Sequence, residues 1–96
     1  MHDVLYAYIA ALVSATRTHP MVTLGASPRG SIALAAIAKA RAYVEGRDYV
    51  LPEDISMMFG AVIGHRIVLN AKARVNHVEV ENVIDEVLNQ VQPPRL

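Results

Sequence analysis

The chain has 96 residues, 53% of them hydrophobic, and its nine basic side chains balance nine acidic ones. This size and composition predict one folded domain rather than a disordered chain. Neutral charge without a run of Lys or Arg argues against a nucleic-acid-binding domain. The absence of cysteine excludes a disulfide framework, a thiolate metal site and a cysteine nucleophile. No stretch has the ~18 uninterrupted apolar residues of a membrane span, and the first residues lack a signal-peptide pattern. We therefore expect a cytoplasmic protein.

A first helix is expected from about Asp3 to Thr18, with Asp3 as its cap. It should end there because His19 precedes Pro20, and that position disfavours the helical region. Residues 21–24 then read as a short extended connection or a strand fragment. The apolar face of this helix consists of Val4, Leu5, Tyr8, Ile9, Leu12 and Val13.

The segment Leu24–Ser31 reads as the start of a second helix. Ser27 is a favourable N-cap, Pro28 suits the first helical position, and Gly25 supplies a flexible turn before them. We expect this helix to run from Pro28 to Glu45, with Gly46 as its stop.

Arg29 is unexpected in this first turn, because the positive end of a helix disfavours a cation by ~0.3–1 kcal/mol. One interpretation is an ion pair with a nearby carboxylate, or a cap on another helix. The other is an anion bound jointly by Arg29 and the free amides of the helix start. At about 100° per residue, Arg29 also continues an apolar stripe that we interpret as the packed face of the helix. That stripe contains Ala33, Ala36, Ala40 and Tyr43, with Ile37 and Val44 beside it.

Pro52 should open a third helix, after the poor cap Leu51. The acidic pair Glu53 and Asp54 is favoured in its first turn and is expected to be solvated. Gly60 and Gly64 indicate crowding at a helix contact. The expected buried face is Ile55, Met58, Phe59, Val62 and Ile63.

The region 67–78 is the least regular, with a turn expected around Asn70 to Arg74. A last helix is expected from about Val80 to Val91, ended by Pro93 and Pro94. Its apolar side consists of Val80, Val83, Ile84, Val87, Leu88 and Val91.

These helices predict an all-α, four-helix bundle-like domain over residues 1–96, with a possible short extended segment near 21–24 or 67–78. Ile37, Phe59, Val62, Ile84 and Leu88 are expected among the members of its core.

No residue pattern indicates catalysis by the chain alone. The four histidines lack zinc-ligand spacing, so we expect no metal site. The serines lack a nucleophile-elbow context. Gly25 and Gly30 fit the frame of a phosphate-binding P-loop, but Ser31 stands where its lysine must be.

Leu24–Ser31 resembles the sensor 2 segment of the MoxR family of AAA+ ATPases. Other pieces resemble that family in the same order. Two residues depart from its pattern: Gly30 stands where a small alanine-like residue is usual, and Leu51 stands where a Ser, Thr or Asp cap is usual. In that family this region is the C-terminal helical lid, which follows an ATP-binding αβα core that these residues lack. The matching pieces are Tyr8-Ile9, Leu12-Val13, Thr16-Arg17, His19-Pro20, Gly46–Val50, Pro52–Ile55 and His65-Arg66.

The resemblance implies that Arg29 contacts the terminal phosphates of ATP held by its own or a neighbouring subunit, supported by Gly25, Ser27 and Pro28. ATP and Mg²⁺ would be held mainly by the core, with neither expected on this chain alone. The implied partners are that core, neighbouring subunits of a ring and a client of a chaperone-like machine. The alternative is a free-standing helical protein-interaction module without a nucleotide role.

Overall fold

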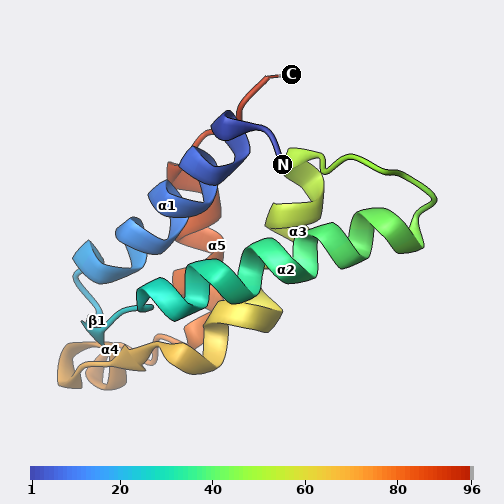
Figure 1. Ribbon diagram of the computed structural model, residues 1–96. Helices are drawn as coiled ribbons and strands as arrows, with labels where there is room; N and C mark the ends of the chain where they lie inside the picture. The colour runs from blue at the N-terminus through green and yellow to red at the C-terminus, as the bar shows by residue number, and fades with distance from the viewer. Residues whose placement is uncertain (96) are drawn as a thin grey trace.

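Four long helices surround a core of apolar side chains in the computed structural model, which describes residues 1–95 (Figure 1). Helix α1 packs on α2 and α5, and α3 packs on the same two helices. The all-α prediction is confirmed, with the addition of a two-stranded sheet. None of the helices in residues 1–95 is long and apolar enough to cross a membrane. The four are α1 (Asp3–Thr18), α2 (Pro28–Val44), α3 (Pro52–Ile63) and α5 (Val80–Gln90).

Helix α1 has the predicted bounds but a different cap. His2 occupies the cap position, and its Nδ1 accepts a hydrogen bond from the Val4 amide at 3.2 Å. Asp3 is instead the first helical residue, where its charge favours the helix dipole. Val4 is 38% exposed, so its predicted burial is wrong. The other five residues of the predicted face are buried: Leu5, Tyr8, Ile9, Leu12 and Val13.

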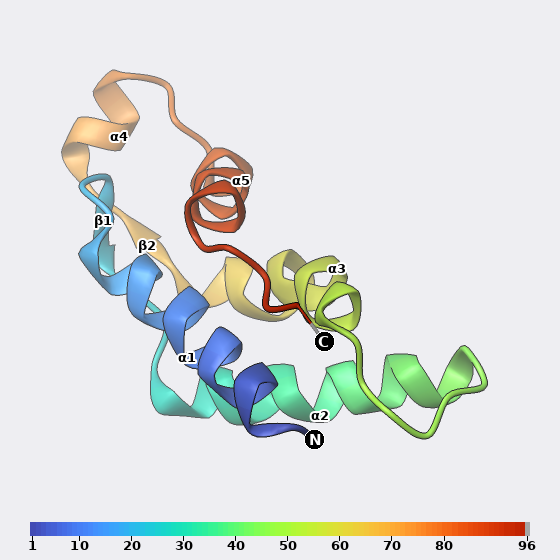
Figure 2. The same ribbon diagram turned by 90° about the horizontal axis from the view of Figure 1, so that it is seen from above.

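Residues 21–24 do contain a strand, as the sequence indicated. Strand β1 (Val22–Leu24) pairs antiparallel with β2 (Val68–Leu69), with Val22 opposite Leu69 and Leu24 opposite Val68. Figure 2 shows this sheet at one end of the molecule and the α2–α3 connection at the other. The molecule extends 44 Å along its longest axis.

The expected turn around Asn70 to Arg74 is wrong, because helix α4 (Ala71–Val75) lies there, after the short 3₁₀ helix η1 (Gly64–Arg66). The Asn70 side chain explains the difference. Its Oδ1 accepts from the Ala73 amide at 3.0 Å and caps α4, while its Nδ2 donates to the Pro20 carbonyl at 2.8 Å. A contact between residues fifty apart thus fixes this helix start.

The core confirms part of the predicted set. Phe59 and Ile84 are buried, and Val62 and Leu88 are half-buried against the core. Ile37 is 38% exposed and does not belong to it. Of the two glycines from which crowding was inferred, Gly60 of α3 has the closer contact, since a Cβ there would lie 3.4 Å from Ile84 of α5. A Cβ on Gly64 of η1 would lie at an ordinary contact distance of 3.7 Å from Val80.

Helix α2 buries a different face from the predicted stripe. The stripe residues Tyr43 and Val44 are 81% and 82% exposed. Alanine and larger apolar residues lie all around this helix, so spacing alone does not distinguish its faces. The buried residues are Gly30, Leu34, Ala38 and Ala42.

Candidate phosphate site at the start of helix α2

Arg29 lies in the first turn of α2, and its side chain is exposed. Within residues 1–95 no carboxylate oxygen lies within 4 Å of its guanidinium. The ion pairs of these residues are formed by His19, Arg41 and Arg47. The ion-pair interpretation of Arg29 therefore receives no support from the fold. The expected position at the end of a packed face is also wrong, since its stripe faces solvent.

The residues before Arg29 form the predicted helix start with one difference. Ser27 is at the cap position with an extended backbone, and Pro28 is the first helical residue. The Ser27 side chain, however, makes no capping hydrogen bond. The Gly30 amide donates to the Ser27 carbonyl at 2.9 Å, whereas the Arg29 amide has no protein acceptor within residues 1–95. The amide of Arg29 is thus left without an acceptor among these residues, as the first amides of a helix usually are.

Two side chains from the last turn of α1 hold the chain just before this start. Thr16 is fully buried, and its hydroxyl donates to the Val13 carbonyl at 2.6 Å and accepts from the Ala26 amide at 3.1 Å. The Arg17 Nε donates to the Ala26 carbonyl at 2.7 Å. Both backbone polar groups of Ala26 are therefore bonded to adjacent side chains of one helix.

Gly25 makes this arrangement possible. A Cβ on Gly25 would lie 2.7 Å from both the backbone nitrogen and the Cα of Arg17, which no side chain could tolerate. The glycine thus allows the chain to approach the backbone of α1, which is a stricter role than the flexible turn that we expected.

Packing against α3 also explains why a glycine stands at position 30. Its Cβ position lies 3.0 Å from Ile63 Cδ1 and 3.5 Å from Arg66 Cδ, so the end of α3 presses on the first turn of α2. A larger residue here would push against a buried core side chain. Glycine in place of the usual alanine-like residue therefore accommodates a close contact between α2 and α3.

The sequence profile of the AAA lid domain matches residues 14–87 of this chain. The chain belongs to the AAA lid domain family. A relative that covers 96% of the chain at 40% identity is the uncharacterized protein YeaC of Bacillus subtilis. The chaperone MoxR1 of Mycobacterium tuberculosis aligns with the whole chain at 36% identity. The resemblance to MoxR-type lids is thereby confirmed.

The fold agrees with this assignment. The crystal structure of a proposed ATPase from Cytophaga hutchinsonii superposes on 98% of the chain with a TM-score of 0.92 and 35% identity. The chain spans only 29% of YeaC, 28% of MoxR1 and 31% of that ATPase. It therefore corresponds to an AAA lid domain that is similar to the matching parts of these proteins.

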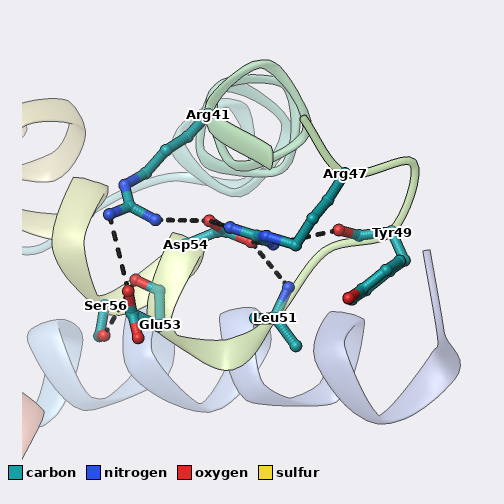
Figure 3. Close-up of polar contacts among 7 residues, drawn as sticks. All are labelled: Arg41, Arg47, Tyr49, Leu51, Glu53, Asp54 and Ser56. Carbon is teal, nitrogen blue, oxygen red and sulfur yellow. Dashed lines mark hydrogen bonds and ion pairs between the residues drawn. The ribbon is translucent and has the colours of Figure 1, made fainter. Parts of the chain in front are cut away.

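A second polar cluster lies at the opposite end of α2 in this lid (Figure 3). Asp54 is fully buried, not solvated as we expected. Its Oδ1 and Oδ2 accept from Arg47 at 2.8 and 2.7 Å, and Oδ1 also accepts from Arg41 at 2.6 Å. The Leu51 amide donates to Oδ2 at 2.7 Å, which is the half of a capping box that remains open to a cap residue with a non-polar side chain.

The hydrogen bonds from Arg47, followed by those from the Leu51 amide and Arg41, hold the pKa of Asp54 well below its usual range, although burial opposes them. A carboxylate held by four donors is not free to accept a proton from a substrate. The cluster therefore joins the α2–α3 connection to both helices.

The histidines do not form a site in the described part of the chain. His19 Nε2 lies 2.6 Å from Glu86 Oε2, and its Nδ1 accepts from the Met21 amide at 3.1 Å, which joins α1 to α5. No group of three or more His, Asp or Glu side chains within residues 1–95 could hold a metal ion.

Proposed function

We propose that this lid supplies Arg29 as the sensor 2 residue of a MoxR-like ATPase and couples the nucleotide state to movement of the lid. Arg29 would contact the terminal phosphates of ATP, with Gly25, Ser27 and Pro28 shaping the segment that presents it. ATP and Mg²⁺ would be held mainly by the ATP-binding core. The whole protein would act in the cytoplasm as a ring of subunits in a chaperone-like machine.

The observation that carries this proposal is the exposed Arg29 guanidinium beside an unpaired amide. A cation at the positive end of a helix is unfavourable by itself, by ~0.3–1 kcal/mol. An anion placed against both groups reverses the sign of that interaction and gains charge-assisted hydrogen bonds. A triphosphate has the charge and the oxygen acceptors to do so.

The exposed face of α2 supports a core domain as the partner of the lid. Ile32 and Tyr43 are 71% and 81% exposed, and helical spacing places both on the side of α2 that carries Arg29. Apolar surface gathered on one helix face is typical of an interaction site. A core docked there would cover this surface and bring its bound ATP toward Arg29.

The test is Arg29→Ala in the complete ATPase. We expect ATP hydrolysis to fall by about 10²–10³-fold, as removal of one positioned donor does at comparable sites. Folding should be unchanged or slightly improved, because an unfavourable charge at the helix start is removed. Arg29→Lys should restore activity only in part, because an ammonium cannot make two parallel contacts. Steady-state hydrolysis and thermal melts measure both effects.

Arg74→Ala is a matched control, because Arg74 is an exposed arginine on α4 rather than on α2. Its hydrolysis should equal that of the unmodified protein. Unchanged hydrolysis in Arg29→Ala would refute the sensor assignment. The lid would then serve as an interaction module without a nucleotide role, which is the competing interpretation of the exposed α2 face.

A further inference from the structure

The segment that presents Arg29 is fixed to α1 rather than to its own helix. Ser27 makes no capping bond, so the start of α2 lacks the usual local anchor. The nearest firm attachment is Ala26, three residues before Arg29, whose amide and carbonyl are bonded to Thr16 and Arg17. Ala26 itself is buried, and a Cβ on Gly30 would lie 3.5 Å from the Ala26 Cβ.

The two anchoring side chains are themselves held by packing and hydrogen bonds. The Thr16 hydroxyl is fully buried and also donates to the Val13 carbonyl, so its orientation toward Ala26 is fixed. Arg17 presents its Nε, held by the path of its own side chain past Gly25. The last turn of α1 is in turn anchored by the buried Leu12 and Val13. The position of Ala26 is thus tied to the packed core through the side chains of Thr16 and Arg17.

We propose that Thr16 and Arg17 are positioning residues for Arg29, an inference that rests on the proposed sensor role of Arg29. They hold the Ala26 peptide groups, and this fixes where α2 begins and where the Arg29 guanidinium points. Thr16 and Arg17 then act together with Gly25 and Ala26. The missing side chain of Gly25 lets the chain approach the backbone of α1, and the two side chains bind the peptide groups of Ala26. Displacement of a catalytic group by 1 Å can lower a rate about 10²-fold, so loss of either hydrogen bond should reduce hydrolysis while Arg29 is present.

Two substitutions remove the bonds with little change of shape. Thr16→Val replaces the hydroxyl by a methyl group, and Thr16→Ser retains the hydroxyl. Arg17→Met retains the stem that passes Gly25 but lacks the Nε donor. In the complete ATPase we expect Thr16→Val and Arg17→Met to lower hydrolysis by roughly 10- to 100-fold. Thr16→Ser should restore most of the activity.

Thr18→Val is the matched control. Thr18 is exposed in the same turn, and its hydroxyl donates only to the Ala15 carbonyl of its own helix, at 3.4 Å. This variant should hydrolyse ATP at the unmodified rate. Thermal melts of all variants, with activity assayed well below each transition, exclude loss of folded protein. Arg17→Met keeps the proposal testable if Thr16→Val does not fold, because Arg17 is exposed and tolerates substitution better.

The decisive measurement repeats the two substitutions in an Arg29→Ala background under single-turnover conditions. If Thr16 and Arg17 act through Arg29, each should then change hydrolysis by less than about twofold, because coupled residues are not additive. The same fold-loss in both backgrounds would overturn the positioning role and indicate direct contact of Arg17 with nucleotide or a general structural effect. No loss in the native background would overturn it as well. A normal rate for Arg29→Ala alone would instead refute the sensor role itself.

Discussion

Two neighbouring acidic residues in the first turn of α3 have opposite environments. Glu53 is exposed, whereas Asp54 is fully buried between Arg41 and Arg47. Their sequence positions predicted the same solvated role for both, because a first turn favours any negative charge. The available signal was the non-polar cap Leu51, whose amide requires an acceptor three residues later. Identification of both arginine partners needed the fold, since Arg41 is thirteen residues away.

At this scale we predict that Asp54→Asn lowers the free energy of unfolding by about 3–5 kcal/mol, as loss of one partner from a buried ion pair does. An amide cannot accept from two guanidinium groups and the Leu51 amide together. Urea unfolding measures the change, and Glu53→Gln is the control, expected within about 0.5 kcal/mol of the unmodified chain. Equal effects of the two substitutions would contradict the assigned role of Asp54.

The unmodified chain and the Asp54→Asn variant also allow a test of how stability depends on pH. Because the pKa of Asp54 is lowered in the folded state, that state binds fewer protons than the unfolded chain in the acid range. The contribution of Asp54 is then complete above the ordinary carboxyl pKa of about 3.9 and declines as the pH falls toward the folded-state pKa. The stability gap between the unmodified chain and Asp54→Asn should therefore be constant near neutrality and narrow below about pH 4. A stability difference between the two proteins that grows as the pH falls would contradict the lowered pKa of Asp54.

Among the elements, α5 was the most predictable and α2 the least. Helix α5 has Val and Ile on one side and charged or amide residues on the other, so its spacing gives both its bounds and its buried face. Helix α2 ended within one residue of the predicted Glu45, because Pro28 and Gly46 mark its limits. Its buried face could not be read, since alanine is compatible with a tight helix contact and with solvent alike.

Helix α4 was missed for a different reason. Five residues are too few to form a helix by local propensity alone. The helix exists because the Asn70 cap is fixed by Pro20 and because Ala73 is buried. Such tertiary support leaves no periodic trace in the sequence. The pairing of Thr16 and Arg17 with Ala26 is similarly invisible in the sequence, while the role of Arg29 stays a prediction from the family resemblance.

The ends of α2 and α4 give a paired prediction. Gly46 follows α2 with φ of +80°, and His77 follows α4 with φ of +55°. Gly46→Ala should lower the free energy of unfolding by about 1 kcal/mol through backbone strain alone, because a Cβ there would meet nothing within 4 Å. His77→Gly should raise it by up to about 1 kcal/mol, since glycine adopts this conformation without strain. Urea unfolding of both variants tests the signs, and a loss of stability in His77→Gly would refute this explanation.

On the scale of the whole molecule, α2 and α3 are joined at both ends. Asp54 and Arg47 link the start of α3 to the end of α2, while Ile63 presses on Gly30 at the other end. Helix α2 is 17 residues long, or about 25 Å, so these attachments lie far apart. The pair is therefore held as one body that presents Arg29 at one end and an exposed apolar face along its length. Such a body suits the proposed role, in which Arg29 and the exposed face of α2 meet an ATP-binding core.

The last prediction concerns what the lid cannot do alone. The P-loop lysine is missing from the sequence, and no acidic cluster within residues 1–95 could hold Mg²⁺. One arginine can stabilise transferred phosphate but cannot position the attacking water or the metal as well. We therefore expect the purified chain to show no ATP turnover above background and only weak nucleotide binding, as measured by phosphate release and calorimetry. Arg29→Ala of the same chain separates the causes of any residual signal. A contaminating ATPase would be unaffected by that substitution, whereas turnover that disappears with Arg29 would contradict the prediction and make the lid an enzyme in its own right.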